Sequence, residues 1–150
     1  MRIVIQRVRR CSVEVEGKVI GEIGKGLAIL LGVEDADTQE DIDWLCGKVS
    51  RLRIFDDENG VMNLDVNQAS GRAIVISQFT LFASTKKGNR PSYIRSAGEA
   101  VARPMYEKFL AKLSEVLGTE VEHGEFGADM QVSLINDGPV TICIDSKNRE

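Results

Sequence analysis

Two short, uninterrupted apolar runs constrain the fold of this chain most strongly. Residues 27–31 read Leu-Ala-Ile-Leu-Leu, and residues 73–76 read Ala-Ile-Val-Ile. Continuous apolar runs of this length, bounded by turn and polar residues, are typical of strands buried on both faces. We therefore expect both segments to be inner strands of a sheet with protein packed on each side.

The remaining strands are predicted near the two ends of the chain. Residues 2–6 open with alternating side chains, and the valine-rich segments 13–15 and 19–20 flank Glu16-Gly17-Lys18, which is typical of a hairpin turn. In the last third, residues 130–135 and 140–145 have strand character. They are expected to be two strands joined by the turn Asn136-Asp137-Gly138-Pro139.

Two helices are predicted between these strands. Thr38 and Asp41 have the spacing of a capping box, and apolar residues then recur at helical spacing until the polar turn at residues 56–60. A second helix should begin near Glu99 and end at Gly118, with Pro104 tolerated only in its first turn.

The size and order of these elements define the fold class. The 150 residues are 43% hydrophobic and contain no repeat or long flexible linker, so we expect residues 1–150 to form a single domain. Two principal helices and about seven strands, connected partly by hairpins, indicate an α+β domain. Its sheet should be mainly antiparallel and curved, in a barrel-like arrangement.

Composition also indicates the cellular compartment in which the protein is expected. No apolar run approaches the roughly 20 residues that a membrane helix needs, so we expect a cytoplasmic protein with no membrane partner. The three cysteines, Cys11, Cys46 and Cys143, are odd in number and lack a C-x-x-C pair. This pattern argues against a disulfide framework and a zinc cage, and favours reduced, mostly buried thiols.

A single histidine restricts the chemistry. Motifs that require two histidines are excluded within one subunit, and the signatures of phosphate loops, dinucleotide sites, zinc proteases and nucleophile elbows are absent. We therefore expect no cofactor and no metal. A charge relay would have to use His123, but a surface or partly buried structural histidine at a strand end is the better explanation of that residue.

The charge distribution limits contacts with nucleic acid. A net charge of −4 is unlike that of a protein that coats a long stretch of nucleic acid, because such binding neutralises many phosphates. Local contacts remain open, since Lys86, Lys87, Arg90 and Arg95 gather in one glycine-containing loop. A solvated surface is the alternative explanation of this cluster.

Two short segments are unusual for plain strands. Ser77, Gln78 and Thr80 place three hydrogen-bonding side chains directly after a fully apolar run, where they face either water or a ligand. The alternative is a continuing strand in which Thr80 satisfies its own hydroxyl. At residues 136–141 an Asp-Gly hairpin would suffice, but Pro139 removes a backbone donor, and a Gly-Pro bond can be cis.

Together these segments resemble the D-aminoacyl-tRNA deacylase family. The hallmarks of that family are a Ser-Gln-Phe-Thr-Leu stretch, present here at residues 77–81, and an Asn-x-Gly-Pro-Val-Thr stretch, present at residues 136–141. The resemblance covers essentially the whole chain and extends to residues 2–8, 88–92 and 126–130.

The resemblance implies a function and a set of site residues. It implies a homodimer that hydrolyses the ester of D-aminoacyl-tRNA, and of glycyl-tRNA, while sparing L-aminoacyl-tRNA. Catalytic positions would be Ser77, Gln78, Phe79 and Thr80. Gly138 and Pro139, joined by a cis bond, would reach into the partner's site, with Asn136, Val140 and Thr141 also assigned to substrate binding. Lys86, Lys87 and Arg90 are the candidates for contact with the acceptor end of tRNA.

Two other classes of function compete with this interpretation. One is a non-catalytic RNA-binding module that retains the scaffold of an editing domain. The other is a general esterase that activates Ser77 or Thr80 with His123. An esterase should cleave small activated esters, whereas a binding module should retain charged D-aminoacyl-tRNA without hydrolysing it.

Overall fold

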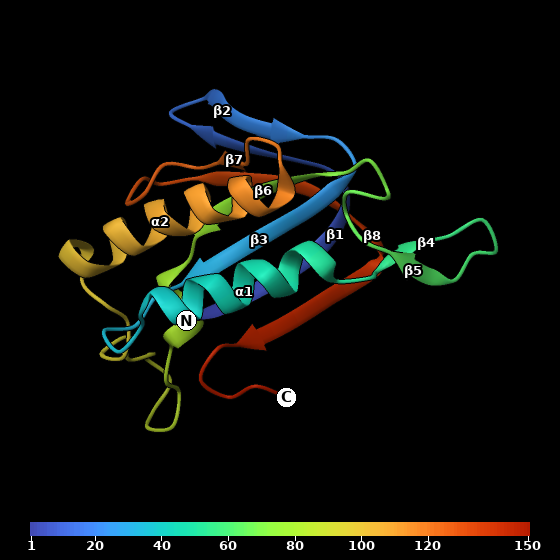
Figure 1. Ribbon diagram of the computed structural model, residues 1–150. Coiled ribbons are helices and arrows are strands. Elements are labelled where there is room, and N and C mark those ends of the chain that lie inside the picture. The colour runs from blue at the N-terminus through green and yellow to red at the C-terminus, as the bar shows by residue number, and fades with distance from the viewer.

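The computed structural model describes all 150 residues. The chain forms a curved sheet with two helices packed on one side (Figure 1). In chain order the elements are β1 (Arg2–Val15), β2 (Lys18–Ile23), β3 (Gly26–Gly32), α1 (Gln39–Arg51), β4 (Phe55–Asp56), β5 (Met62–Leu64), β6 (Arg72–Ser77), the short 3₁₀ helix η1 (Phe79–Phe82), α2 (Glu99–Leu117), β7 (Glu122–His123) and β8 (Gln131–Asp145). The predicted α+β class is confirmed.

The long strand β1 organises the sheet. One of its edges pairs with β3 and then β2, and the other edge pairs with β8, all antiparallel. The main sheet has the order β2-β1-β3-β6-β7, in which β3–β6 and β6–β7 are parallel. A Cβ atom added to Gly21 of β2 would lie 2.5 Å from the carbonyl oxygen of His123 in β7. The sheet thus curls until its edge strands nearly meet, as the barrel-like prediction requires.

The two apolar runs are covered on both faces, as predicted. Leu27, Ile29 and Leu31 join the 25-residue core between the sheet and the helices, whereas Ala28 joins a second cluster of seven residues inside the curl of the sheet. The segment at 73–76 divides in the same way. Alternate side chains of one strand therefore enter two separate cores, because successive residues point to opposite faces.

Both helices form where the sequence predicts them, with one correction. The N–H of Thr38 donates to Asp41 Oδ2 at 2.8 Å, which confirms the capping box, and Gly118 ends α2 with a φ of 69°. Pro104, however, lies in the second turn of α2, so the prediction that it is tolerated only in the first turn is wrong. Ala100 and Pro104 are both exposed, and water can satisfy the carbonyl that loses its helical partner.

The predicted turn between two final strands is also wrong. Residues 131–145 form the single strand β8, and both of its halves pair with β1. Asn136 lies opposite Val8 and Thr141 opposite Gln6, so four residues of β8 bulge out where β1 has only Arg7. The chain keeps its direction because both halves continue the same ladder, which a hairpin would have ended.

The cysteines and the helices bear on two further expectations. All three thiols are free, with Cys11 and Cys46 buried and Cys143 exposed, in agreement with mostly buried, reduced cysteines. Neither helix combines the length and apolarity needed to cross a membrane.

A buried polar cluster ties the chain ends to α1. The ammonium group of Met1 contacts Asp37 and donates to Ser146 Oγ at 3.0 Å. Asp41 accepts from Ser146 Oγ at 2.6 Å and from Lys147 Nζ at 2.8 Å. Burial alone would raise the pKa of Asp41, but these hydrogen bonds outweigh it and hold the pKa well below its usual range.

We predict that Asp41→Asn lowers the free energy of unfolding at pH 7 by about 2 kcal/mol, because it weakens hydrogen bonds to a charged group. The contribution of Asp41 should be complete above its ordinary pKa near 4 and should fade as the pH drops below it, since the folded-state pKa is depressed. Urea unfolding at pH 7 and pH 3 measures this. Asp43→Asn, at an exposed position of the same helix, is the control; an equal loss in both variants would contradict the prediction.

Candidate active site

The segment that follows β6 leaves the sheet at once. The strand ends at Ser77, the N–H of Gln78 donates to the Leu31 carbonyl at 2.7 Å, and residues 79–82 turn into η1. The alternative of a continuing strand is therefore wrong. In a short 3₁₀ helix the first N–H groups have no partner within the helix. The first such bond here is made by Leu81 to Gln78 at 3.3 Å, so the N–H groups of Phe79 and Thr80 precede it.

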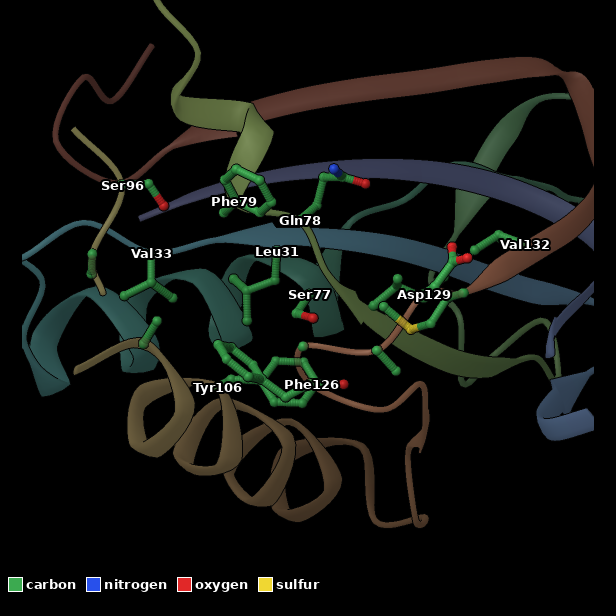
Figure 2. A pocket seen from close by; sticks show the side chains of 16 residues that line it. Leu31, Val33, Ser77, Gln78, Phe79, Ser96, Tyr106, Phe126, Asp129 and Val132 are labelled. Carbon is green, nitrogen blue, oxygen red and sulfur yellow. The ribbon is translucent and has the colours of Figure 1, made fainter. Parts of the chain in front are cut away.

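A cavity of about 300 Å³ opens beside this segment. Figure 2 shows its lining: Ser77, Gln78 and Phe79 form one wall, and Tyr106 of α2 and Phe126 form the opposite one. The rings of Tyr106 and Phe126 are 5.7 Å apart. Burial raises the pKa of Tyr106, whose hydroxyl donates to the Val75 carbonyl at 2.9 Å. The cavity is thus mostly apolar, with two aromatic rings on one side.

Thr80 lies next to this cavity and lacks an activating base. Its hydroxyl accepts a hydrogen bond from the side-chain amide of Gln78. His123 is exposed, and its Nδ1 lies 2.7 Å from the carbonyl oxygen of Gly124. No hydrogen bond joins His123 to Ser77 or Thr80, so the geometry provides no relay for a general esterase. No group of three or more His, Cys, Asp or Glu side chains is placed to hold a metal ion.

The Gly138-Pro139 segment forms the exposed bulge of β8. Its peptide bond is cis, and Gly138 has a φ of 135°. Asn136 braces the bulge, because its Oδ1 accepts from the Val140 N–H at 3.0 Å and its Nδ2 donates to Thr141 Oγ1 at 3.0 Å. These neighbours hold the shape of the bulge and leave Gly138 and Pro139 at the surface.

Arg7 forms hydrogen bonds that hold the bulge in place. The sequence interpretation missed this role. Arg7 is only 7% exposed, and its Nε donates to the Asp137 carbonyl at 3.0 Å. Its Nη1 donates to the Ile54 carbonyl at 2.7 Å and lies 3.3 Å from Asp56 Oδ1. The signal was present in the sequence, since Arg7 continues the alternation of the buried Ile3 and Ile5 and so had to lie on the inner face.

The two segments singled out by sequence do not meet within one chain. Arg2 Nη1 donates to the Leu81 carbonyl at 3.1 Å, and Arg7 Nε reaches Asp137. These arginines are five residues apart on β1, a separation of roughly 17 Å in an extended strand. Ser77, Gln78 and Phe79 line one cavity, Thr80 follows them in η1, and residues 136–141 form the bulge and its flanks. Lys86, Lys87 and Arg90 lie exposed in the loop beyond η1.

Comparison with known proteins places the chain in a family. Residues 4–145 match the family model described as D-Tyr-tRNA(Tyr) deacylase. The chain belongs to this family. It is 60% identical over 150 residues, all of both chains, to the D-aminoacyl-tRNA deacylase of Bacteroides thetaiotaomicron, and 58% identical to that of Dechloromonas aromatica over 147 residues, 98% of each chain.

Solved structures agree with this placement of the deacylase-family chain. The structure of a c-Myc DNA Unwinding Element Binding Protein is 38% identical to it, with a TM-score of 0.91 over 97% of this chain and 98% of the other. A probable eukaryotic D-amino acid tRNA deacylase superposes with a TM-score of 0.84, covering 95% and 97% of the two chains, at 15% identity. The second match shows a shared fold.

We predict that Gly138→Ala distorts the bulge and costs about 1–3 kcal/mol of stability, because a non-glycine residue is strained at this φ. The added Cβ would also lie 2.8 Å from Val140 Cγ2 and 3.2 Å from Arg7 Nη2. Urea unfolding measures the loss. Gly24→Ala is the matched control, since its Cβ would meet no atom within 4 Å. Equal stability of the two variants would show that the bulge accommodates a side chain.

Proposed function

We propose that this protein hydrolyses the ester bond of D-aminoacyl-tRNA, and of mischarged glycyl-tRNA, to the free amino acid and tRNA. The observation that carries the proposal is the identity of about 60%, over the full length, to curated D-aminoacyl-tRNA deacylases. The cavity beside residues 77–79 provides a place for the substrate within the same fold.

The active site is formed by two subunits. Gly138 and Pro139 are exposed. Arg7, which contacts their segment, and Arg2, which contacts η1, lie roughly 17 Å apart along β1. A two-fold axis midway between these points would bring the bulge of each subunit to η1 of the other, because a two-fold contact exchanges the two positions. One dimer then contains two equivalent sites, each built from both chains.

A hollow on the same face supports this interface. It measures about 680 Å³ and lies along the part of β1 and β8 next to η1, with Leu81, Ile142 and Ile144 among its lining. Exposed apolar surface of this kind is typical of protein contacts. A second copy of the chain is the occupant that would also complete the catalytic site.

The cavity suits the terminal adenosine of tRNA. Aromatic rings stack on bases without requiring a particular sequence, and Tyr106 and Phe126 offer such surfaces. Ser77 and Gln78 lie at the opposite wall, where they can position the ribose and the ester. Lys86, Lys87 and Arg90 then lie beyond η1, in a position to contact the few phosphates of the acceptor end.

Handedness is selected by backbone shape. In the shared site the carbonyl of the partner subunit's Gly138 accepts a hydrogen bond from the α-ammonium of the substrate. This carbonyl leaves no space for the side chain of an L-amino acid. D-amino acids direct their side chains away from this wall, and glycine has none to reject. Selection by exclusion needs no contact with the accepted side chain.

The chemistry requires little acid–base catalysis. An ester of a ribose hydroxyl with a neighbouring free hydroxyl is already activated, and the 2′-hydroxyl of the substrate can assist the attacking water. The N–H groups of Phe79 and Thr80 would stabilise the oxyanion that forms. Thr80, held by Gln78 and without a base, orients the substrate by hydrogen bonding. Because this site uses no imidazole, the exposed position of His123 is no obstacle.

Deacylation assays test the activity. D-tyrosyl-tRNA and glycyl-tRNA should be hydrolysed, whereas L-tyrosyl-tRNA and small activated esters should remain intact. Only the first two substrates both fill the cavity and fit beside the Gly138 carbonyl. Retention of D-tyrosyl-tRNA in a stable, unhydrolysed complex would identify a binding module instead. Rapid cleavage of small esters would favour a general esterase.

Mixed subunits test the shared site. Gly138→Ala distorts the wall that one chain contributes. Phe79→Ala, at a side chain that is 56% exposed, damages the pocket of the other. Each variant alone should have little activity. Randomly mixed dimers should regain roughly a quarter of the wild-type rate, since half of them are heterodimers with one intact site out of two. No recovery after confirmed subunit exchange would place the whole site in one chain.

A further inference from the structure

The β4–β5 hairpin projects from one end of the molecule (Figure 1). The contacts of Arg7 with Ile54 and Asp137 place the Gly138 bulge near the base of this hairpin. Near its tip Val61 is 57% and Met62 53% exposed. The hairpin is nonetheless well braced: Asp57 Oδ1 accepts from the N–H groups of Asn59 at 2.9 Å and Val61 at 3.1 Å. Two large apolar side chains are therefore held out in solvent by a fixed turn, without a partner in their own chain.

Arg7 joins this hairpin to the bulge. Its guanidinium contacts the Ile54 carbonyl and Asp56 at the base of the hairpin and the Asp137 carbonyl next to Gly138. Because one buried side chain bonds to both segments, they keep a fixed relative position. If the bulge contacts another subunit, the hairpin must therefore lie close to that subunit as well.

The other end of the molecule presents a complementary surface. The ring of Tyr93 packs edge-on against Phe79 with 5.0 Å between centroids, and the next residue, Ile94, is 89% exposed. Both belong to the segment that follows the loop closed by paired hydrogen bonds between Ser84 and Ser92, at 2.8 and 2.9 Å. An exposed apolar patch, Phe79-Tyr93-Ile94, thus borders the cavity on its outer side.

The charges of the two surfaces are opposite. The hairpin carries Asp56, Asp57 and Glu58, and the loop carries Lys86, Lys87 and Arg90. Neither Glu58 nor these three basic residues take part in an ion pair within the chain. Opposite potentials orient two surfaces as they approach. The same acidic residues would repel phosphates, which makes RNA an unsuitable partner for the hairpin.

We infer that the β4–β5 hairpin of each subunit packs against the Phe79-Tyr93-Ile94 patch of the other and closes the outer side of its active site. The inference rests on the proposed shared site, because the exchange of bulge and η1 also brings hairpin and patch together. Val61 and Met62 would then meet Tyr93 and Ile94. The contact would exclude water from the rim of the cavity and hold Phe79, whose N–H faces the reacting ester in the proposed mechanism.

Cross-linking tests the contact directly. In a Cys143→Ser background, which removes the exposed native thiol, the double variant Met62→Cys/Ile94→Cys is treated with a short bis-maleimide. Covalent dimers should form at protein concentrations where light scattering shows the native dimer. Each single cysteine variant should give few, and so should the control pair Val19→Cys/Ile94→Cys, which uses an equally exposed residue of β2.

The outcomes separate the two proposals. A native dimer that forms no more covalent product than the control pair would overturn the hairpin contact and leave the shared site standing. A monomer in solution would overturn both. As a functional measure, Val61→Ser/Met62→Ser should lower kcat/KM for D-tyrosyl-tRNA by about tenfold, whereas Val19→Ser/Ile20→Ser should leave it unchanged. Equal rates in the two double variants would show that the hairpin has no part in the site.

Discussion

The pairing of β1 with β8 is the constraint on which the rest of the structure depends. Because β1 is hydrogen-bonded to neighbouring strands along both edges, its residues hold fixed positions across the sheet. Arg2 at one end contacts the η1 segment, and Arg7 further along supports the Gly138 bulge. The ladder thus fixes how far apart the two motifs lie within a chain. That separation is the observation behind the proposal that two copies of the chain share the site.

Local signals predicted much of the fold. The capping box at Thr38, the apolar runs and the stop at Gly118 are each decided by a few neighbouring residues, and all three are confirmed. The bulge at residues 137–140 was misinterpreted as part of a hairpin turn over residues 136–139, because an Asp-Gly pair occurs in both structures. The choice is made by β1, more than a hundred residues away in the chain, which pairs with both flanks. The parallel pairing of β3 with β6 is equally non-local and left no signal within either strand.

The candidate site was predictable in its residues and much less so in its arrangement. The resemblance to a family identified residues 77–81 and 136–141 and implied that the second segment serves the partner's site, but it said nothing of how each segment is held within its own chain. The aromatic wall of the cavity comes from Tyr106 in α2 and Phe126 before β8, two positions that only the folded chain brings together. Arg7 could have been found from its place in the alternation of β1. It was overlooked because a charged side chain is rarely buried in a strand, so the alternation was not extended to it.

The backbone wall of the proposed shared site would affect which substrates the enzyme can accept. Side chains that recognised the amino acid would narrow its range, since each contact favours one chemical group over another. A glycine carbonyl at a fixed position rejects one direction of substitution at the α-carbon and is indifferent to what is attached on the other side. Gly138 has a positive φ and close neighbours at the position of a Cβ, so in the proposed site its conformation would tolerate substitution least. Hydrogen bonds from Arg7 to the Asp137 carbonyl and from the Val140 N–H to Asn136 stabilise that conformation. With the proposed site, the enzyme would be strict about handedness and tolerant of side-chain identity at the same time.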